Sequence, residues 1–271
     1  MLLTKHKTTN GSRWAVDGYF LPSNLHLSML LEMSQPDMLA AVVNSATDEP
    51  AHGEAEAPID PQHEVWAAGV TYLRSRDARK AESTVADMYE KVYGAERPEL
   101  FTKSMGWRVM GPSAPIRIRR DSHWNVPEPE LVLIINSAKE IVGYCAGNDV
   151  SSRDIEGENP LYLPQAKIYN GSCALGHGIW ICEPDVIQDI PIQLEVRRAA
   201  HTIFTGEART SSMKRTLPEL VDFLTRELDF PQGVFLMTGT CLVPEGGFTL
   251  QPEDLVRIQV GMLKIENKVQ I

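Results

Sequence analysis

The chain has 271 residues, of which 43% are hydrophobic and 23% are charged, a composition typical of soluble globular proteins. Its formal net charge of -10 offers no basic face to nucleic acid or to an anionic membrane, so we expect neither as a partner. Residues 1–9 lack the apolar run of a signal peptide, and no stretch of about 18 apolar residues follows. We therefore predict a cytoplasmic protein.

The first sixty residues predict two short helices followed by a linker. Apolar residues recur near helical spacing across 24–45, on either side of Pro36, which interrupts helical hydrogen bonding. Residues 47–63 lose this periodicity and are rich in Pro, Gly, Glu, Asp and Ala. We predict a small N-terminal region and linker over residues 1–60, and a catalytic domain over residues 61–271.

Beyond residue 60 the sequence predicts many short strands and few helices. Residues 64–72 read as an apolar strand, and residues 74–93 as an amphipathic helix. Thr216 and Glu219 have the spacing of a helix capping box. The remaining predicted strands are 116–120, 131–136, 141–147, 179–182, 192–198, 235–238 and 255–265. This pattern favours an α+β fold that is mainly β, an antiparallel or mixed roll, over a Rossmann-type sheet.

The four cysteines predict no metal or disulfide chemistry. They lie far apart, with no CxxC pair, at Cys145, Cys173, Cys182 and Cys241. This spacing argues against a thiolate zinc site and against a disulfide framework. We expect them to pack as small buried hydrophobic residues.

Three acidic residues form the most informative pattern. Glu128 and Glu130 are two residues apart at the start of the apolar run LVLII, so in a strand both side chains lie on one face. Residues 136–140 read as a turn, and a hairpin folded there places Asp149 opposite the start of the first strand. A pair of acids spaced in this way is more typical of a solvated strand face, and the hairpin with Asp149 leaves both interpretations open.

A metal ion would resolve the repulsion that such a cluster creates. Opposed like charges in a sheet cost roughly 0.2–1 kcal/mol, and more when they are partly buried. An all-oxygen ligand set selects hard divalent cations, with Mg²⁺ as our first choice and Mn²⁺ or Ca²⁺ as alternatives. Three protein ligands would leave coordination positions for water and substrate.

The order of these motifs resembles the fumarylacetoacetate hydrolase superfamily from about residue 64 to the end. The matching strings are EPELVLII, NDVSSRD, LPQAKIYNGSCALG and TGT. The resemblance implies a mixed β-sandwich roll that forms homodimers or homotetramers and binds a divalent cation. It implies that Glu128, Glu130 and Asp149 hold the metal, that Lys167 is catalytic, and that the substrate-binding residues are Lys103, Arg153, Tyr72, Gly239 and Thr240.

One departure from the family bears on the reaction. Members that cleave carbon-carbon bonds use a His and Glu pair to activate water, and here Ser75 and Ala78 stand at those positions. Neither side chain is a general base at neutral pH. The strings GVTYLRSR, ERPELF, VPEPEL and GENPLYLPQAKIY instead resemble the 2-dehydro-3-deoxy-D-arabinonate dehydratase branch. That branch implies a catalytic role for Glu99, which from its residue type alone would be a solvated loop acid.

The resemblance therefore implies a metal-dependent lyase that dehydrates a 2-keto-3-deoxy sugar acid. The metal would chelate the carboxylate and keto oxygens and stabilise an enolate, with Lys167 or Glu99 as the base. Two alternatives stay open at this point. One is a carbon-carbon hydrolase or decarboxylase of a diketo acid that uses another base, and the other is a non-catalytic family member that binds a metal.

Overall fold

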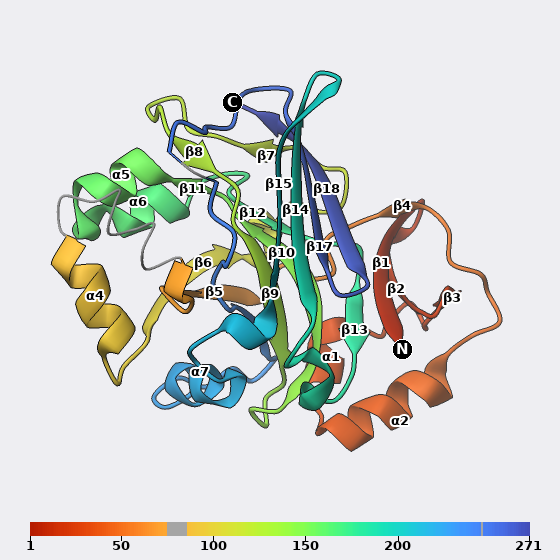
Figure 1. Cartoon of the computed structure of the whole chain (residues 1–271). Helices are drawn as coiled ribbons and strands as arrows, with labels where there is room; N and C mark the ends of the chain where they lie inside the picture. Colours follow the sequence, from red (N-terminus) through yellow and green to blue (C-terminus); the bar gives the residue numbers. More distant parts are fainter. Residues whose placement is uncertain (75–85, 245) are drawn as a thin grey trace.

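The computed structural model describes residues 1–74, 86–244 and 246–271 and is built mainly from β-strands (Figure 1). The strands are β1 Leu2–Thr8, β2 Gly11–Val16, β3 Tyr19–Phe20, β4 Glu54–Ala55, β5 Glu64–Gly69, β6 Glu99–Met105, β7 Ile116–Arg117, β8 Asn125–Val126, β9 Pro129–Ile135, β10 Ile141–Asp149, β11 Ser151–Ser152, β12 Cys173–Leu175, β13 Ile179–Ile181, β14 Pro191–Arg198, β15 His201–Arg209, β16 Val234–Met237, β17 Leu255–Val260 and β18 Leu263–Gln270. The α-helices are α1 Leu27–Leu31, α2 Gln35–Ser45, α4 Ala86–Gly94, α5 Arg153–Glu158, α6 Leu163–Lys167 and α7 Leu217–Leu224.

Two sheets carry the fold, and the core lies between them. The larger has the order β3-β2-β1-β13-β10-β9-β16-β5-β6, with β12 and β4 paired at its side, and the smaller has the order β15-β14-β17-β18-β7. Every residue of β9 and β10 is buried, which explains their apolar runs over residues 131–135 and 141–147. Along β18, in contrast, buried and exposed residues alternate. The smaller sheet therefore turns one face to the core and the other to solvent, as the predicted mainly β roll requires.

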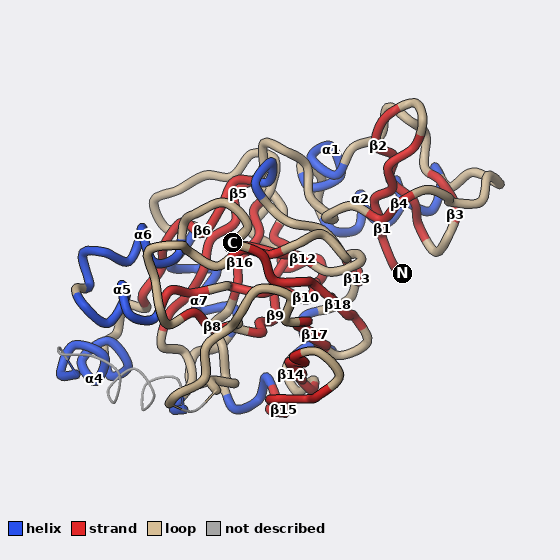
Figure 2. The backbone as a smooth tube through the Cα atoms, turned by 90° about the horizontal axis from the view of Figure 1, so that it is seen from above, coloured by secondary structure: helices blue, strands red, loops and turns tan. Residues whose placement is uncertain are grey.

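The N-terminal region is a hairpin and two helices that lie to one side of the main body (Figure 2). The two predicted helices are confirmed as α1 and α2, and Pro36 lies in the first turn of α2, where its missing N–H is harmless. The hairpin of β1 and β2 was not predicted. Strand β1 also pairs with β13, through Leu2 opposite Trp180 and Leu3 opposite Ile179, so this region extends the larger sheet.

Several strand predictions need correction. The single strand predicted over 255–265 is wrong, because Gly261, with φ of 56°, turns the chain between β17 and β18. Strands β6 and β15 were not predicted: β6 contains polar residues that are buried in the fold, and β15 is exposed or half-exposed along its whole length. Of the helix predicted over 74–93, α4 covers the last part, and residues 75–85 lie outside the described residues.

Two local predictions are confirmed. The Thr216 side chain accepts a hydrogen bond from the backbone N–H of Glu219, and the Glu219 side chain accepts one from the backbone N–H of Thr216, which forms the capping box of α7. The cysteines are free thiols, and the expected burial holds for Cys145, Cys173 and Cys241, whereas Cys182 is half-buried. Within the ranges that the structure describes, no helix is long and apolar enough to cross a membrane.

Candidate active site

The hairpin of β9 and β10 sets the geometry of the site. Its turn is closed by the backbone N–H of Asn136, which donates to the carbonyl oxygen of Glu140 at 3.0 Å. The register then places Gly147 opposite Glu130, and the N–H of Asp149 donates to the carbonyl oxygen of Glu128 at 3.0 Å. The start of one strand therefore meets the end of the other, as the sequence predicted.

The three predicted carboxylates gather in the protein interior. Glu128, Glu130 and Asp149 each offer an oxygen within 4.8 Å of the others, and they are only 2%, 1% and 1% exposed. Burial, followed by the charges of Asp149 and Glu128, raises the pKa of Glu130 well above its usual value. The backbone N–H of Gly239, which donates to Glu130 Oε2 at 2.7 Å, opposes this effect. Three buried acids at this spacing need positive charge to be stable.

Two lysines contact the same carboxylates directly. Lys167 Nζ lies 2.9 Å from Glu128 Oε2 and 3.0 Å from Asp149 Oδ2, and it donates to Ser151 Oγ at 2.5 Å. Lys103 Nζ lies 2.5 Å from Asp149 Oδ1. Both lysines were predicted site residues, and both are almost fully buried. They supply part of the compensation that the acids require.

Arg153 connects the triad to a fourth buried acid that the sequence analysis missed. Its Nη2 lies 2.9 Å from Glu128 Oε1, and its Nη1 lies 2.8 Å from an oxygen of Glu156, which is 2% exposed. The signal was the three-residue spacing of Arg153 and Glu156, which places both on one side of α5. We call Glu128, Glu130, Asp149 and Glu156, with Lys103, Arg153 and Lys167, the carboxylate cluster.

The carboxylate cluster fits a hard divalent cation. A cavity of about 10 Å³ adjoins it, lined by Ala68, Gly69, Val70, Phe101, Glu128, Asp149, Lys167 and Thr240. A space of that size holds one water-sized sphere. Each carboxylate oxygen has two lone pairs, so an oxygen that accepts from a lysine or arginine can still bind a metal. Four acids against three cations also leave one negative charge among these residues.

The remaining predicted residues surround this point. Gly239 has φ of 95°, and a Cβ there would meet Thr71 Oγ1 at 2.1 Å, so only glycine can hold this loop against Glu130. Thr240 lines the cavity. Tyr72 is 1% exposed, and burial, with the nearby Cys241 and Glu130, raises its pKa well above the usual value. The fold therefore brings all three residues close to the carboxylates.

Glu99 packs beside the cavity because its neighbour in the sheet is a glycine. Glu99 begins β6 and lies opposite Gly69 at the end of β5. A Cβ built on Gly69 would lie 2.0 Å from Glu99 Oε2, so the carboxylate packs directly against the glycine backbone. Because Gly69 also lines the cavity, Glu99 is a partly buried acid beside the cavity rather than a solvated loop residue.

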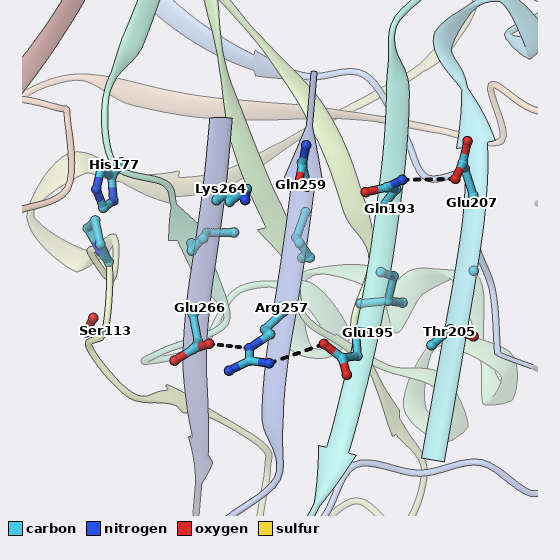
Figure 3. Close-up of a pocket in the computed structure, with 15 residues that line it drawn as sticks. Ser113, His177, Gln193, Glu195, Thr205, Glu207, Arg257, Gln259, Lys264 and Glu266 are labelled. Atoms are coloured by element: carbon cyan, nitrogen blue, oxygen red, sulfur yellow. Dashed lines mark hydrogen bonds and ion pairs between the residues drawn. The ribbon is translucent and has the colours of Figure 1, made fainter. Parts of the chain in front are cut away.

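A second and much larger hollow lies elsewhere and gathers none of the predicted site residues. It measures about 910 Å³ and lies on the solvent face of the smaller sheet (Figure 3). We call this hollow the sheet groove, and its charged side chains include Glu195, Glu207, Arg257, Lys264 and Glu266. Arg257 is paired with Glu266 and lies 3.4 Å from Glu195.

The chain belongs to the fumarylacetoacetate hydrolase family. The family model described as "Fumarylacetoacetate (FAA) hydrolase C-terminal" matches residues 64–270, which include the whole carboxylate cluster. The fold class implied by the sequence resemblance is thereby confirmed.

Its relatives include two dehydratases of sugar acids. A probable 2-keto-3-deoxyxylonate dehydratase of Haloferax volcanii is 45% identical over 219 residues, which cover 79% of this chain and 74% of the relative. A 2-dehydro-3-deoxy-D-arabinonate dehydratase of Saccharolobus solfataricus is 42% identical over 212 residues, covering 75% and 70%. A solved structure of 2-keto-3-deoxy-D-arabinonate dehydratase complexed with magnesium and 2,5-dioxopentanoate has a TM-score of 0.84 and 31% identity, with 100% and 99% of the two chains covered.

Proposed function

We propose that this protein is a divalent-cation-dependent dehydratase of 2-keto-3-deoxy sugar acids. One observation carries the proposal: three buried carboxylates converge within 4.8 Å of one another, surrounded by buried cations. The relatives at 42% and 45% identity are dehydratases of 2-keto-3-deoxy pentonates, and the magnesium complex gives the metal in a similar fold. Mg²⁺ is therefore the cation that we assign.

The charges of the site support an anionic substrate. With all seven side chains ionised, the carboxylate cluster carries one net negative charge, so a divalent cation changes its sign to one positive charge. The positive charge of the metal-loaded cluster then favours an anion such as the carboxylate of a sugar acid. The cluster is thus suited to bind a divalent cation and a monoanionic acid together.

The chain's own residues can carry both proton transfers of a dehydration. When bound, a divalent cation polarises the keto group of the acid and makes its C3 proton more acidic. Lys167 Nζ has three acceptors, a geometry that suits an ammonium, so we assign it as the donor that protonates the departing C4 hydroxyl. Glu99 then accepts the C3 proton on its carboxylate. Water leaves to give a 5-hydroxy-2-oxo-3-enoic acid. Loss of a C5 proton then forms a dienol, and protonation of C3 and C4 gives the dioxo acid.

A carbon-carbon hydrolase is the second candidate in the same family, and the sequence argues against it. Ser75 and Ala78, which replace the water-activating pair, lie outside the described residues, but their side chains supply no base. A non-catalytic role fits poorly with Lys167, because it is held by three side-chain contacts beside the cavity.

The direct test is turnover with and without metal. Protein treated with a chelator and then given Mg²⁺ should convert 2-keto-3-deoxyarabinonate or 2-keto-3-deoxyxylonate to a dioxo acid, and should release no pyruvate from acylpyruvates. Asp149→Asn should lose turnover together with Mn²⁺ binding, measured by calorimetry. Full activity of the chelated enzyme, or cleavage of acylpyruvates, would refute the proposal.

Two further expectations belong with this function. The homodimer or homotetramer implied by the family, and the cytoplasmic location, stay predictions. Analytical ultracentrifugation of the active enzyme and fractionation of the source cells test them separately.

A further inference from the structure

Lys103 is enclosed by protein and does not line the cavity. Its side chain is 0% exposed, and Nζ lies 2.5 Å from Asp149 Oδ1. The same ammonium donates to the carbonyl oxygen of Val150 at 3.1 Å and to that of Lys167 at 2.5 Å. The ammonium therefore has two hydrogen-bonded carbonyl oxygens and one carboxylate at ion-pair distance. Lys103 is also absent from the residues that line the cavity beside the carboxylates.

The partners of Lys103 belong to the two elements that carry the proposed chemistry. Asp149 ends β10 and is a proposed metal ligand, whereas Lys167 ends α6 and is the proposed proton donor. Its bond to the Lys167 carbonyl oxygen satisfies an acceptor at the C-terminus of α6, which has no partner within the helix. Ser172 Oγ donates to the same oxygen at 2.8 Å. The ammonium thus ties the end of a strand to the end of a helix.

We infer that Lys103 is a positioning residue that holds Asp149 and the backbone of Lys167 in a fixed relation, and that it does not contact the 2-oxo acid. The inference rests on the proposed function and changes the substrate-binding role that the family resemblance implies for this lysine. Because its two hydrogen bonds and its ion pair join groups that must be aligned for proton transfer, loss of the ammonium should slow the reaction without weakening substrate binding.

The test compares three variants by turnover and by binding of pyruvate, a simple 2-oxo acid, in the presence of Mg²⁺. Lys103→Met keeps the length and removes the donors, and we expect kcat to fall by about 100-fold or more, because misplacement of about 1 Å has that effect. The KM and the pyruvate Kd should stay within threefold of the wild type. Ser172→Ala removes one donor to the Lys167 carbonyl oxygen and should lower kcat by less than tenfold.

Lys139→Met is the matched control. Lys139 Nζ also donates to a backbone carbonyl oxygen, that of Thr225 at 2.9 Å, but it lies in the hairpin turn at the far end of β9 and β10. Its kcat and KM should equal those of the wild type. If Lys103→Met does not fold, as judged by thermal unfolding, Lys103→Arg takes its place. The expected result is again a lower kcat with an unchanged KM.

The inference is overturned if either Lys103 variant raises KM and the pyruvate Kd tenfold or more, or if both Lys103→Arg and Ser172→Ala keep wild-type kcat. A wild type that binds pyruvate but does not dehydrate the sugar acids would overturn the proposed function alone, since the Kd still decides the role of Lys103. Wild-type protein that neither binds pyruvate nor dehydrates the sugar acids would overturn both the inference and the proposed function.

Discussion

The carboxylate cluster and the sheet groove hold the same kinds of charged side chains in opposite surroundings. In the cluster, the side chains of Lys167 and Glu128 are 1% and 3% exposed, whereas those of Arg257 and Glu266 in the groove are 41% and 48% exposed. Water screens the groove pairs, so each contributes little, whereas every charge in the cluster must be balanced by a neighbour. The larger hollow is therefore the weaker candidate for chemistry, because burial and not size creates reactivity.

The largest expected effect comes from removing the buried ammonium of Lys167 in the carboxylate cluster. Lys167→Met should lower kcat by about 10²–10⁴-fold, the range for loss of a general acid or base. Glu128, Glu130 and Asp149 remain, so Mn²⁺ should still bind, as calorimetry would measure. Loss of metal binding with retained turnover would be incompatible with the assigned role.

Gly69→Ala asks whether the position of Glu99 matters. The new methyl group would lie where Glu99 Oε2 now packs, so the carboxylate must move, and kcat should fall by about 10- to 100-fold. Gly94→Ala is the control, because a Cβ there meets nothing within 4 Å. Equal activities of the two variants would remove Glu99 from the mechanism.

Glu130→Gln separates stability from function in the cluster. The raised pKa of Glu130 means that its charge opposes folding when no cation is present. In chelator, the amide should raise the unfolding temperature by about 2–4 °C, equivalent to about 1 kcal/mol for a domain of this size. With Mg²⁺ present, the wild type should have the higher unfolding temperature. Differential scanning calorimetry measures the unfolding temperatures in both conditions. A lower melting temperature of the variant in chelator would contradict the reasoning.

The smallest effect should come from the groove. Arg257→Ala breaks the pairs with Glu195 and Glu266, and it should change the free energy of unfolding by about 1 kcal/mol or less, since exposed pairs contribute little. Turnover should be unchanged, and high salt should remove most of the stability difference. Urea titrations at low and high salt measure it. A large loss of turnover would make the groove a functional site after all.

The contrast also explains what the sequence could and could not predict. The hairpin that brings Glu128 to Asp149 was predictable, because a turn between two apolar strands fixes the register locally. Strand β6 was not, because Lys103 and Ser104 look like surface residues until their buried partners are known. Glu156 was missed for the same reason, because its ion pair with the buried Arg153 becomes visible only in the folded structure.

The pairing of β1 with β13 has a consequence for anyone who shortens this chain to the part that the family model matches. Without residues 1–60, the backbone edge of β13 beside Ile179 and Trp180 would lose its partner strand. Bare strand edges recruit strands from other molecules. A trimmed enzyme could keep every residue of its chemistry and still precipitate, so solubility rather than catalysis would limit its use.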